Sequence, residues 1–384
     1  MSIENEPRSY MQKISTYKLR PGMVAALNIY NVNGNKLLSK GTVLSKKYIQ
    51  RLTDLAISGV YVSVGNPSFD FDAPEDILDE SIRIEATKKI YQTFQKCQLT
   101  GILDIEGLSS TTNAIIDNLL HKKTNLIQMM EIRKYDTYTF AHSVNVCTLA
   151  TMIGILKNYS KKRLYELSIG ALLHDIGKIK IPTQILNKRG RLTSDEFEIM
   201  KQHSELGFFL LRKNKALSIV PMHVAFQHHE KYDGQGYPRR LKQKAIHEYA
   251  RIVAIADVYD ALTADRSYKS AVPPYEAYKI MVKESGIHFD PDLLELFFEH
   301  VAVFPIGTTV KLMDGSFGIV TEVALGKVFT PKVKLITTKD GDAMQKPTII
   351  DLSCNPRLYI EKTLNEAEVF DLMEKVFKLK FLPE

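Results

Sequence analysis

Cysteine is scarce in this chain, which carries only three, Cys97, Cys147 and Cys354, at wide spacing. An odd, scattered set of thiols argues against a disulfide framework and is typical of a reducing compartment. Long apolar runs are also missing, since no stretch approaches the roughly 18 uninterrupted apolar residues that a membrane span needs. The N-terminus lacks a basic segment followed by an apolar core. We therefore expect a cytoplasmic protein with no membrane span.

Sequence signatures of nucleoside triphosphate binding and of nucleic-acid binding are absent as well. The sequence contains no Walker loop, no glycine-rich repeat and no low-complexity tract. Its net charge of +7 would suit an anionic ligand, or would simply keep the protein in solution. No dense basic tract with interleaved aromatic residues accompanies that charge, so no nucleic-acid polymer is expected as a partner.

The sequence does have room for several packed units. Its 384 residues allow two or three domains, and a hydrophobic content of 45% is sufficient for their cores. The expected fold class is mainly α, with an all-helical central domain between two smaller modules. The predicted divisions are a small α+β N-terminal module at 1–70, connecting helices at 71–124, the helical domain at 125–302, and a β-rich C-terminal extension with a closing helix at 303–384.

Both ends of the chain are predicted to be rich in strands. Between 14 and 64, apolar and polar residues alternate around turn signals, and a helix is expected at 46–56. After residue 303 the pattern predicts strands at 307–312, 318–323 and 332–337, and then a closing helix at 366–378.

The connecting region is predicted to be helical at 77–97 and 111–133. One apolar stripe follows the first of these helices. Such a stripe is usually a packing face within one chain, and a signalling or dimerisation helix is the alternative, so a homodimer through the connecting helices stays open. The stripe consists of Ile82, Ala86, Ile90 and Phe94.

Two metal-ligand side chains stand next to each other at His174-Asp175, in an apolar segment that is predicted to be helical. A buried carboxylate is costly unless a counter-charge or a metal ion compensates it. One interpretation is a single salt-bridged pair at a helix end, with Gly177 as the C-cap and Pro182 ending the helix. The other is a metal site, and the dipeptide alone does not choose between them.

Further histidines and aspartates in apolar settings favour the metal site. Neutral imidazole and carboxylate together suit a first-row transition metal, and a shared aspartate is what a two-metal hydrolytic site needs. Asp175 is the candidate bridge, because a carboxylate has two oxygens. The other candidates are His142, His203, the pair His228-His229, and Asp257.

A second carboxylate, Asp260, lies one helical turn after Asp257. The apolar residues of 249–264 follow helical spacing, so one helix is expected to present both carboxylates. Asp260 is then part of the site, or else an N-cap or a surface charge.

Several motifs in order resemble one known family. His174-Asp175 with Gly177-Lys178, then His228-His229-Glu230, Asp233-Gly234 and Gly236-Tyr237-Pro238 resemble an HD-GYP domain, a subgroup of the HD phosphohydrolases. The likeness covers about 125–300. It implies an all-helical catalytic domain that hydrolyses cyclic di-GMP to linear pGpG and, in many members, onward to GMP. The segment before it is similar to the small α+β module that often precedes such domains.

The resemblance also implies roles for individual residues. Two cations would polarise the phosphodiester and lower the pKa of a bridging water, which attacks as hydroxide, so that no side-chain nucleophile is required. Lys178 and Arg266 are suited to neutralise phosphoryl charge, although either could be an ordinary surface cation. The implied catalytic residues are Asp175 and Lys178, the implied metal ligands are His142, His174, Asp175, His203, His228, His229 and Asp257, and the implied substrate contacts are Lys178, Tyr237, Asp260, Arg266 and Lys269.

The chain departs from the family pattern at two places. Members with a third metal have a glutamate where this chain has Tyr138, and a phenol with an unperturbed pKa of about 10 is a poor ligand at neutral pH. We therefore predict two divalent metal ions, with iron and manganese both plausible. Arg240 and Gln243 stand where the family often has glycines, which predicts a stiffer, more basic loop and leaves the substrate preference open.

Other readings stay open at this point. The substrate could be a mixed cyclic GMP-AMP, or the protein could be a slow or non-catalytic receptor for a cyclic dinucleotide. The remaining histidines match no ligand position of the family and are expected to be surface or structural residues. They are His121, His223, His247, His288 and His300.

Overall fold

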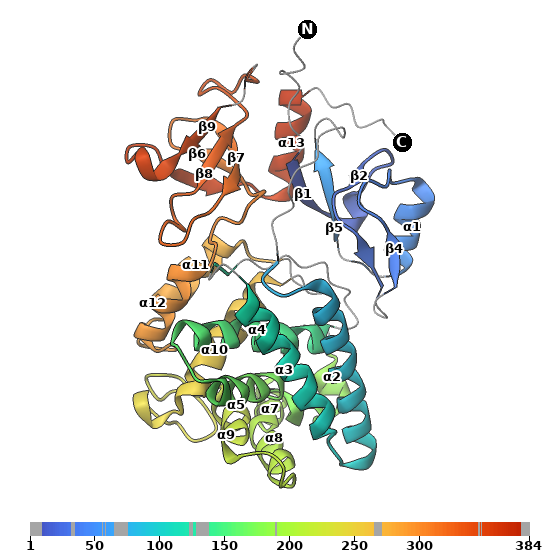
Figure 1. Cartoon of the computed structure of the whole chain (residues 1–384), viewed down its shortest axis with the longest axis vertical. Helices are drawn as coiled ribbons and strands as arrows, with labels where there is room; N and C mark the ends of the chain where they lie inside the picture. Colours follow the sequence, from blue (N-terminus) through green and yellow to red (C-terminus); the bar gives the residue numbers. More distant parts are fainter. Residues whose placement is uncertain are drawn as a thin grey trace.

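The computed structural model describes residues 10–31, 35–55, 57, 59–64, 76–122, 126–127, 138–188, 190–264, 271–344, 346 and 348–377. These residues form a large helical body and two small strand-rich modules, one from each end of the chain (Figure 1). Both modules lie at the same end of the helical body. The mainly helical fold class that the sequence predicts is confirmed.

The N-terminal module is built on a three-stranded antiparallel sheet in the order β1-β5-β2. Ser45 caps its helix by accepting a hydrogen bond from the N–H of Tyr48, which satisfies one of the open amides of the first turn. Leu52 and Val60 are buried in the core of the module. The elements are β1 (Tyr10–Ser15), η1 (Thr16–Lys18), β2 (Val24–Ala25), β3 (Ile29–Tyr30), β4 (Lys36–Leu38), α1 (Lys46–Asp54) and β5 (Gly59–Val64).

Helix α4 is the centre of the helical body. Every residue from 142 to 154 is buried, which is the pattern of a helix that others surround. Helices α2, α3, α5, α10 and α12 pack against it. The helices are α2 (Glu80–Thr100), α3 (Ile105–His121), α4 (Tyr138–Leu156), α5 (Lys161–Leu172), α6 (Thr183–Leu186), α7 (Ser194–Lys201), α8 (His203–Arg212), α9 (Ile219–Gln227), α10 (Glu248–Thr263), α11 (Pro274–Lys283) and α12 (Pro291–His300).

The C-terminal module is a five-stranded antiparallel sheet in the order β10-β6-β7-β8-β9. A last helix covers it, with Val369 and Leu372 packed against Ile319 and Ile336 of the module. The elements are β6 (Thr309–Leu312), β7 (Phe317–Glu322), β8 (Lys332–Leu335), β9 (Ile349–Asp351), β10 (Ile360–Thr363) and α13 (Glu366–Phe377).

Helix α13 also joins the two ends of the chain. The carboxylate of Glu366 accepts hydrogen bonds from the backbone N–H and the hydroxyl of Ser15, at 2.6 and 2.9 Å. It lies 3.2 Å from the ammonium of Lys18, and Phe370 packs against the N-terminal core. In Figure 1 this helix stands between the two modules.

The predicted helices are present with shifted ends. The helix expected at 46–56 ends at Asp54, and the closing helix expected at 366–378 is α13. The helix expected at 77–97 is α2, which runs from Glu80 to Thr100. The prediction of a helix at 111–133 is wrong in both bounds, because α3 begins at Ile105, where Asp104 caps it, and ends at His121.

The apolar stripe of α2 is a packing face within the chain. Ala86, Ile90 and Phe94 are buried, and α2 packs against α3 and α4. This stripe is therefore not available as the dimer contact that the sequence left open. Among the described helices, none is both long and apolar enough to cross a membrane.

Candidate metal centre

The His174-Asp175 pair lies in a turn, not in a helix. Helix α5 ends at Leu172, its C-cap is Leu173, and the short 3-10 helix η3 (Ile176–Lys180) begins after Asp175. The prediction that the pair lies in a helical segment is therefore wrong, and so is the placement of Gly177 as a C-cap in the salt-bridge alternative. Both side chains of the pair are buried, at 0% and 2% exposed. The carboxylate therefore needs a counter-charge or a metal ion beside it.

Gly177 has a different role, because it lets η3 touch the start of α8. A Cβ at this position would lie 1.9 Å from the backbone oxygen of His203, closer than non-bonded atoms can approach. The contact brings His203, the first residue of α8, next to the turn that carries Asp175. Only glycine permits this approach, so the local chain geometry sets the distance between these two side chains.

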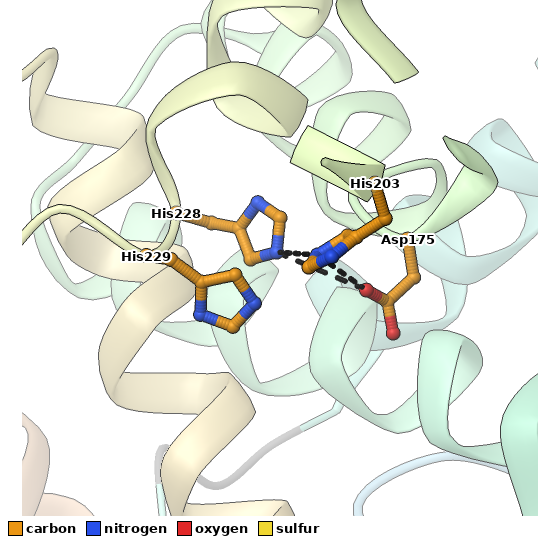
Figure 2. Close-up of side chains that lie close together, drawn as sticks. All are labelled: Asp175, His203, His228 and His229. Atoms are coloured by element: carbon orange, nitrogen blue, oxygen red, sulfur yellow. Dashed lines mark hydrogen bonds and ion pairs between the residues drawn. The ribbon is translucent and has the colours of Figure 1, made fainter. Parts of the chain in front are cut away.

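Four of the predicted ligands converge in a first group, shown in Figure 2: Asp175, His203, His228 and His229. The Nε2 atom of His203 lies 3.4 Å from the Asp175 Oδ1 atom and 3.3 Å from the Nε2 atom of His228. The Nδ1 atoms of His203 and His228 lie 2.7 and 2.9 Å from the backbone oxygens of Met200 and Ala225. Those contacts place the ring protons on Nδ1, so both Nε2 lone pairs face the group.

A second group contains His142, His174 and Asp257. The Nε2 atom of His142 lies 3.1 Å from the Asp257 Oδ1 atom. His174 makes the same backbone contact as the histidines of the first group, with its Nδ1 atom 2.7 Å from the oxygen of Ala171. Its Nε2 atom lies 3.4 Å from the Asp175 Oδ2 atom. Asp175 therefore offers one oxygen to each group.

The two groups fit divalent metal ions. Within each, the candidate ligand atoms lie within 4.8 Å of one another. The His174 Nε2 and Asp175 Oδ1 atoms are buried and have no hydrogen-bond partner among the described residues. A buried polar atom without a partner costs roughly 1–3 kcal/mol, which a bound cation would offset. A donor set of imidazole nitrogens and carboxylate oxygens suits a first-row transition metal.

The electrostatics of the two groups differ. Burial lowers the pKa of His203 to about 4 and that of His229 to about 3. Burial also acts to lower the pKa of His142, but the hydrogen bonds to Asp257 and Asp260 outweigh it and raise that pKa to about 9. The first group therefore holds neutral imidazoles, the form that binds metals.

Lys178 lies on the outer side of Asp175. Its ammonium is 2.5 Å from the Asp175 Oδ2 atom and is partly exposed. Burial acts to raise the pKa of Asp175, but the charges of Lys178 and His174 outweigh it and leave that pKa well below its usual value. The carboxylate is therefore ionised and available as a ligand at neutral pH, and the partly exposed Lys178 adds a positive charge beside it.

The loop that contains Gly236-Tyr237-Pro238, here called the signature loop, is held to the site by Glu230. This buried carboxylate accepts hydrogen bonds from the backbone N–H groups of Arg239 and Leu241, at 2.7 and 2.9 Å. The loop so closed places the ring of Tyr237 against His229, with ring centroids 4.8 Å apart. The position of Tyr237 thus depends on two charge-assisted hydrogen bonds.

Replacing Glu230 by glutamine should loosen this loop. The new amide can accept from only one of the two N–H groups and would turn a donor toward the other, which costs about 1–3 kcal/mol of stability. Because Tyr237 moves with the loop, we expect a higher KM for the substrate, measured by steady-state kinetics together with denaturant unfolding. The matched control is Glu295→Gln on the exposed face of α12. Equal stability and KM in both variants would contradict the prediction.

The loop also carries the two departures from the family pattern. Arg240 and Gln243 have φ values of 56° and 48°, in the left-handed region where glycine is favoured. The backbone therefore keeps a glycine-like conformation although the side chains differ. Both side chains are exposed, so the extra positive charge of Arg240 faces solvent.

Asp260, which the sequence assigns to the substrate wall, contacts the candidate metal ligand His142. It is buried at 2% exposure, with its Oδ2 atom 2.7 Å from the Nδ1 atom of His142. Its Oδ1 atom accepts a hydrogen bond from Asn145 at 2.8 Å. Asp260 therefore holds a candidate metal ligand from behind, and its contact with the substrate stays a prediction.

Some predicted residues cannot be placed. Arg266 and Lys269 lie outside the described residues, as does the side chain of Tyr138. The histidines expected to be surface or structural belong to neither group. His223, for example, is partly exposed and lies beside Gln227 on α9.

Sequence reasoning missed Asn145. A signal for it exists, because Asn145 is a polar residue one helical turn after His142 in an otherwise apolar segment. Its amide N–H group donates to Asp260, and it is completely buried. Arg83, which donates a hydrogen bond to Asn145, comes from α2, and no such signal marks it in the sequence.

Two family models match the chain. Residues 115–293 match the model of an HD domain, and residues 309–372 match that of a KOW domain associated with HD domains. The first contains both groups of candidate ligands. The second covers most of the C-terminal module.

Three curated relatives illustrate the likeness. A cyclic di-GMP phosphodiesterase of Pseudomonas aeruginosa is 29% identical over 372 residues, 89% of each chain. A cyclic di-GMP phosphodiesterase of Thermotoga maritima is 41% identical over 165 residues, 43% of this chain and 45% of the relative. A 3'3'-cGAMP-specific phosphodiesterase of Vibrio cholerae is 38% identical over 177 residues, 46% of this chain and 34% of the relative. The chain thus spans most of the first relative and less than half of the other two.

Proposed function

We propose, from the premise that this chain belongs to the HD-GYP family of HD domain proteins, that it is a metal-dependent phosphodiesterase for cyclic di-GMP. The reaction adds water across a phosphodiester bond and gives linear pGpG, with GMP as a possible further product. The observation that carries the proposal is the pair of His/Asp groups on either side of Asp175. A shared carboxylate between two cation sites is the arrangement that metal-assisted phosphodiester hydrolysis needs.

We propose two ions per chain, iron or manganese, one in each group. Bound there, they would supply Lewis acidity toward the phosphate and an activated water. His203, His228 and His229 would hold one ion, His142, His174 and Asp257 the other, and Asp175 both.

Other side chains are proposed to handle the substrate. Lys178, which is partly exposed beside Asp175, would neutralise charge on a phosphoryl oxygen. Tyr237, which lies against His229, offers a ring beside the reacting phosphate. For Arg266 and Lys269 the proposal rests on the family motif alone. Asp175 and Lys178 are the residues to which we assign the catalytic roles.

A mixed cyclic GMP-AMP is the second candidate substrate. The relative of that specificity from Vibrio cholerae is 38% identical to the chain, close to the 41% of the cyclic di-GMP enzyme of Thermotoga maritima. The basic loop around Arg240 adds a further difference from the family pattern. A slow receptor for the dinucleotide is a weaker candidate, because a receptor would not need the complete set of metal-ligating side chains that this chain has.

The test is hydrolysis by the metal-loaded protein. Purified under anaerobic conditions and loaded with Fe(II) or Mn(II), the protein should convert cyclic di-GMP to pGpG faster than it converts cyclic GMP-AMP, as chromatography of the products would show. The reverse order would replace the first substrate by the second. Binding without turnover under every metal would favour the receptor, and no binding would exclude all three.

The remaining assignments are proposals as well. We divide the chain into an N-terminal module (1–70), connecting helices (71–124), the catalytic domain (125–302) and a C-terminal extension (303–384). The three cysteines are free and two are buried, which supports the cytoplasm as the compartment. Dimerisation, if it occurs, must use a surface other than the buried stripe of α2.

A further inference from the structure

A continuous chain of hydrogen bonds leads from helix α2 to the candidate metal ligand His142. The guanidinium of Arg83 donates from Nη1 to the Oδ1 atom of Asn145 at 2.6 Å. The Nδ2 atom of Asn145 donates to Asp260 at 2.8 Å, and the other oxygen of Asp260 lies 2.7 Å from the Nδ1 atom of His142. The four side chains come from α2, α4 and α10, and all are buried.

The chemistry of these groups permits only one arrangement. Arg83 has donors only, and the ionised Asp260 has acceptors only. An amide between them must turn its oxygen to Arg83 and its nitrogen to Asp260. The second oxygen of Asp260 accepts from the Nδ1–H of His142, which orients the ring and aims Nε2 at Asp257. The orientation of the ligand ring therefore depends on the arginine.

A buried arginine is expensive for mere packing. Arg83 is 5% exposed, and its other terminal nitrogen, Nη2, donates to Asp76 at 2.7 Å. An apolar side chain of similar length would pack α2 on α4 without the cost of removing a guanidinium from water. What the guanidinium adds is direction, because its planar fork holds Asp76 and Asn145 at the same time.

Arg83 also lies outside the region that matches the HD domain model, which begins at residue 115. It belongs to the first helix after the N-terminal module, and Asp76 lies just before that helix. A displacement of the start of α2 would therefore pull on Arg83 and, through Asn145 and Asp260, on His142.

We propose that Arg83 is a positioning residue of the metal centre, which orients His142 through Asn145 and Asp260 and so couples the helix after the N-terminal module to the catalytic site. The inference rests on the proposed function for the identity of the site as a metal centre. It adds a residue outside the HD domain and a route by which the N-terminal module acts on catalysis.

The test replaces Arg83 by methionine and by lysine and measures Mn(II) binding by titration, separately from turnover. In Arg83→Met one of the two Mn(II) affinities should fall about 10- to 100-fold, the range for residues that orient a metal ligand through hydrogen bonds. The kcat for cyclic di-GMP should fall with it while KM changes little. Arg83→Lys, which can still donate to Asn145, should recover part of both losses.

The matched control is Lys89→Met on the same helix. Lys89 pairs with Asp104 at 2.7 Å. It takes no part in the relay, the chain of hydrogen bonds from Arg83 to His142. This variant loses a cation from α2 in the same way and should bind Mn(II) like the wild type. A merely structural role for Arg83 would lower the unfolding temperature of Arg83→Met and leave both Mn(II) affinities unchanged, and that result would overturn the proposal.

Two further outcomes are decisive. If Arg83→Met does not fold, Asp76→Ala replaces it, because the loss of that anchor frees the guanidinium to turn away from Asn145, and about a 3-fold or larger loss of Mn(II) affinity is expected. Unchanged affinity in that variant also overturns the relay.

The wild type separates the relay from the proposed function. If it binds no Mn(II), the metal centre of the proposed function fails and the relay fails with it. If it binds Mn(II) and the Arg83 variants bind equally well, only the relay is rejected.

Discussion

Replacing Asp175 by alanine should lower kcat on the order of 10³-fold or more, equivalent to about 4 kcal/mol of lost transition-state stabilisation. The reason is the position of the carboxylate, whose two oxygens each lie 3.4 Å from a histidine Nε2 atom, one in each group. Both metal sites should weaken in this variant. Steady-state kinetics and Mn(II) titration on the same sample would measure the two effects.

The control for this variant is Asp117→Ala. Asp117 is a partly exposed aspartate of α3 that pairs with Lys161, and an ion pair in contact with solvent contributes little. It should turn over like the wild type. Loss of only one ion from Asp175→Ala would show that Asp175 is not shared, and normal turnover would remove it from the site altogether.

Removing the metal with a chelator should abolish hydrolysis and lower the thermal stability of the protein. The His174 Nε2 and Asp175 Oδ1 atoms, which have no hydrogen-bond partner among the described residues, would lose the cation that we assign to them. Ligand linkage gives the size of the effect, about 4 kcal/mol for each ion present at 1,000 times its dissociation constant. Thermal scans with and without chelator would measure it.

Metal analysis of the reloaded protein tests the stoichiometry. We expect two ions per chain and recovery of activity when Mn(II) is added back. Three ions per chain would refute the argument from Tyr138. Equal melting temperatures for the stripped and reloaded protein would contradict the stabilising role of the ions, and activity that survives chelation would contradict the metal requirement.

The chemistry of the site could be predicted from the sequence because its ligands are rare residue types in apolar settings. His174-Asp175 and His228-His229 are visible as anomalies, and the order of the motifs carries the resemblance to the HD-GYP family. The local geometry was harder to predict. Nothing in the sequence shows that α5 ends at Leu172, since the apolar pattern continues through the turn.

Side chains that act through another residue were the hardest to predict. Asp260 has the spacing of a second site carboxylate, and only the structure turns it toward His142 and Asn145. Arg83 is one cation among the 51 lysines and arginines of the chain, and no pattern separates it from the exposed ones. Its burial depends on how α2 packs against α4, which is a tertiary property.

The contact between Ser15 and Glu366 has a consequence for the order in which the protein is made. The two residues are 351 positions apart, so at usual rates of synthesis roughly 20 to 70 s separate their appearance on the ribosome. The N-terminal module has a core of its own and can fold during this interval. Its docking to α13 must wait until α13 has been synthesised. A partner that binds the Ser15 face of the N-terminal module would therefore compete with α13 best during synthesis.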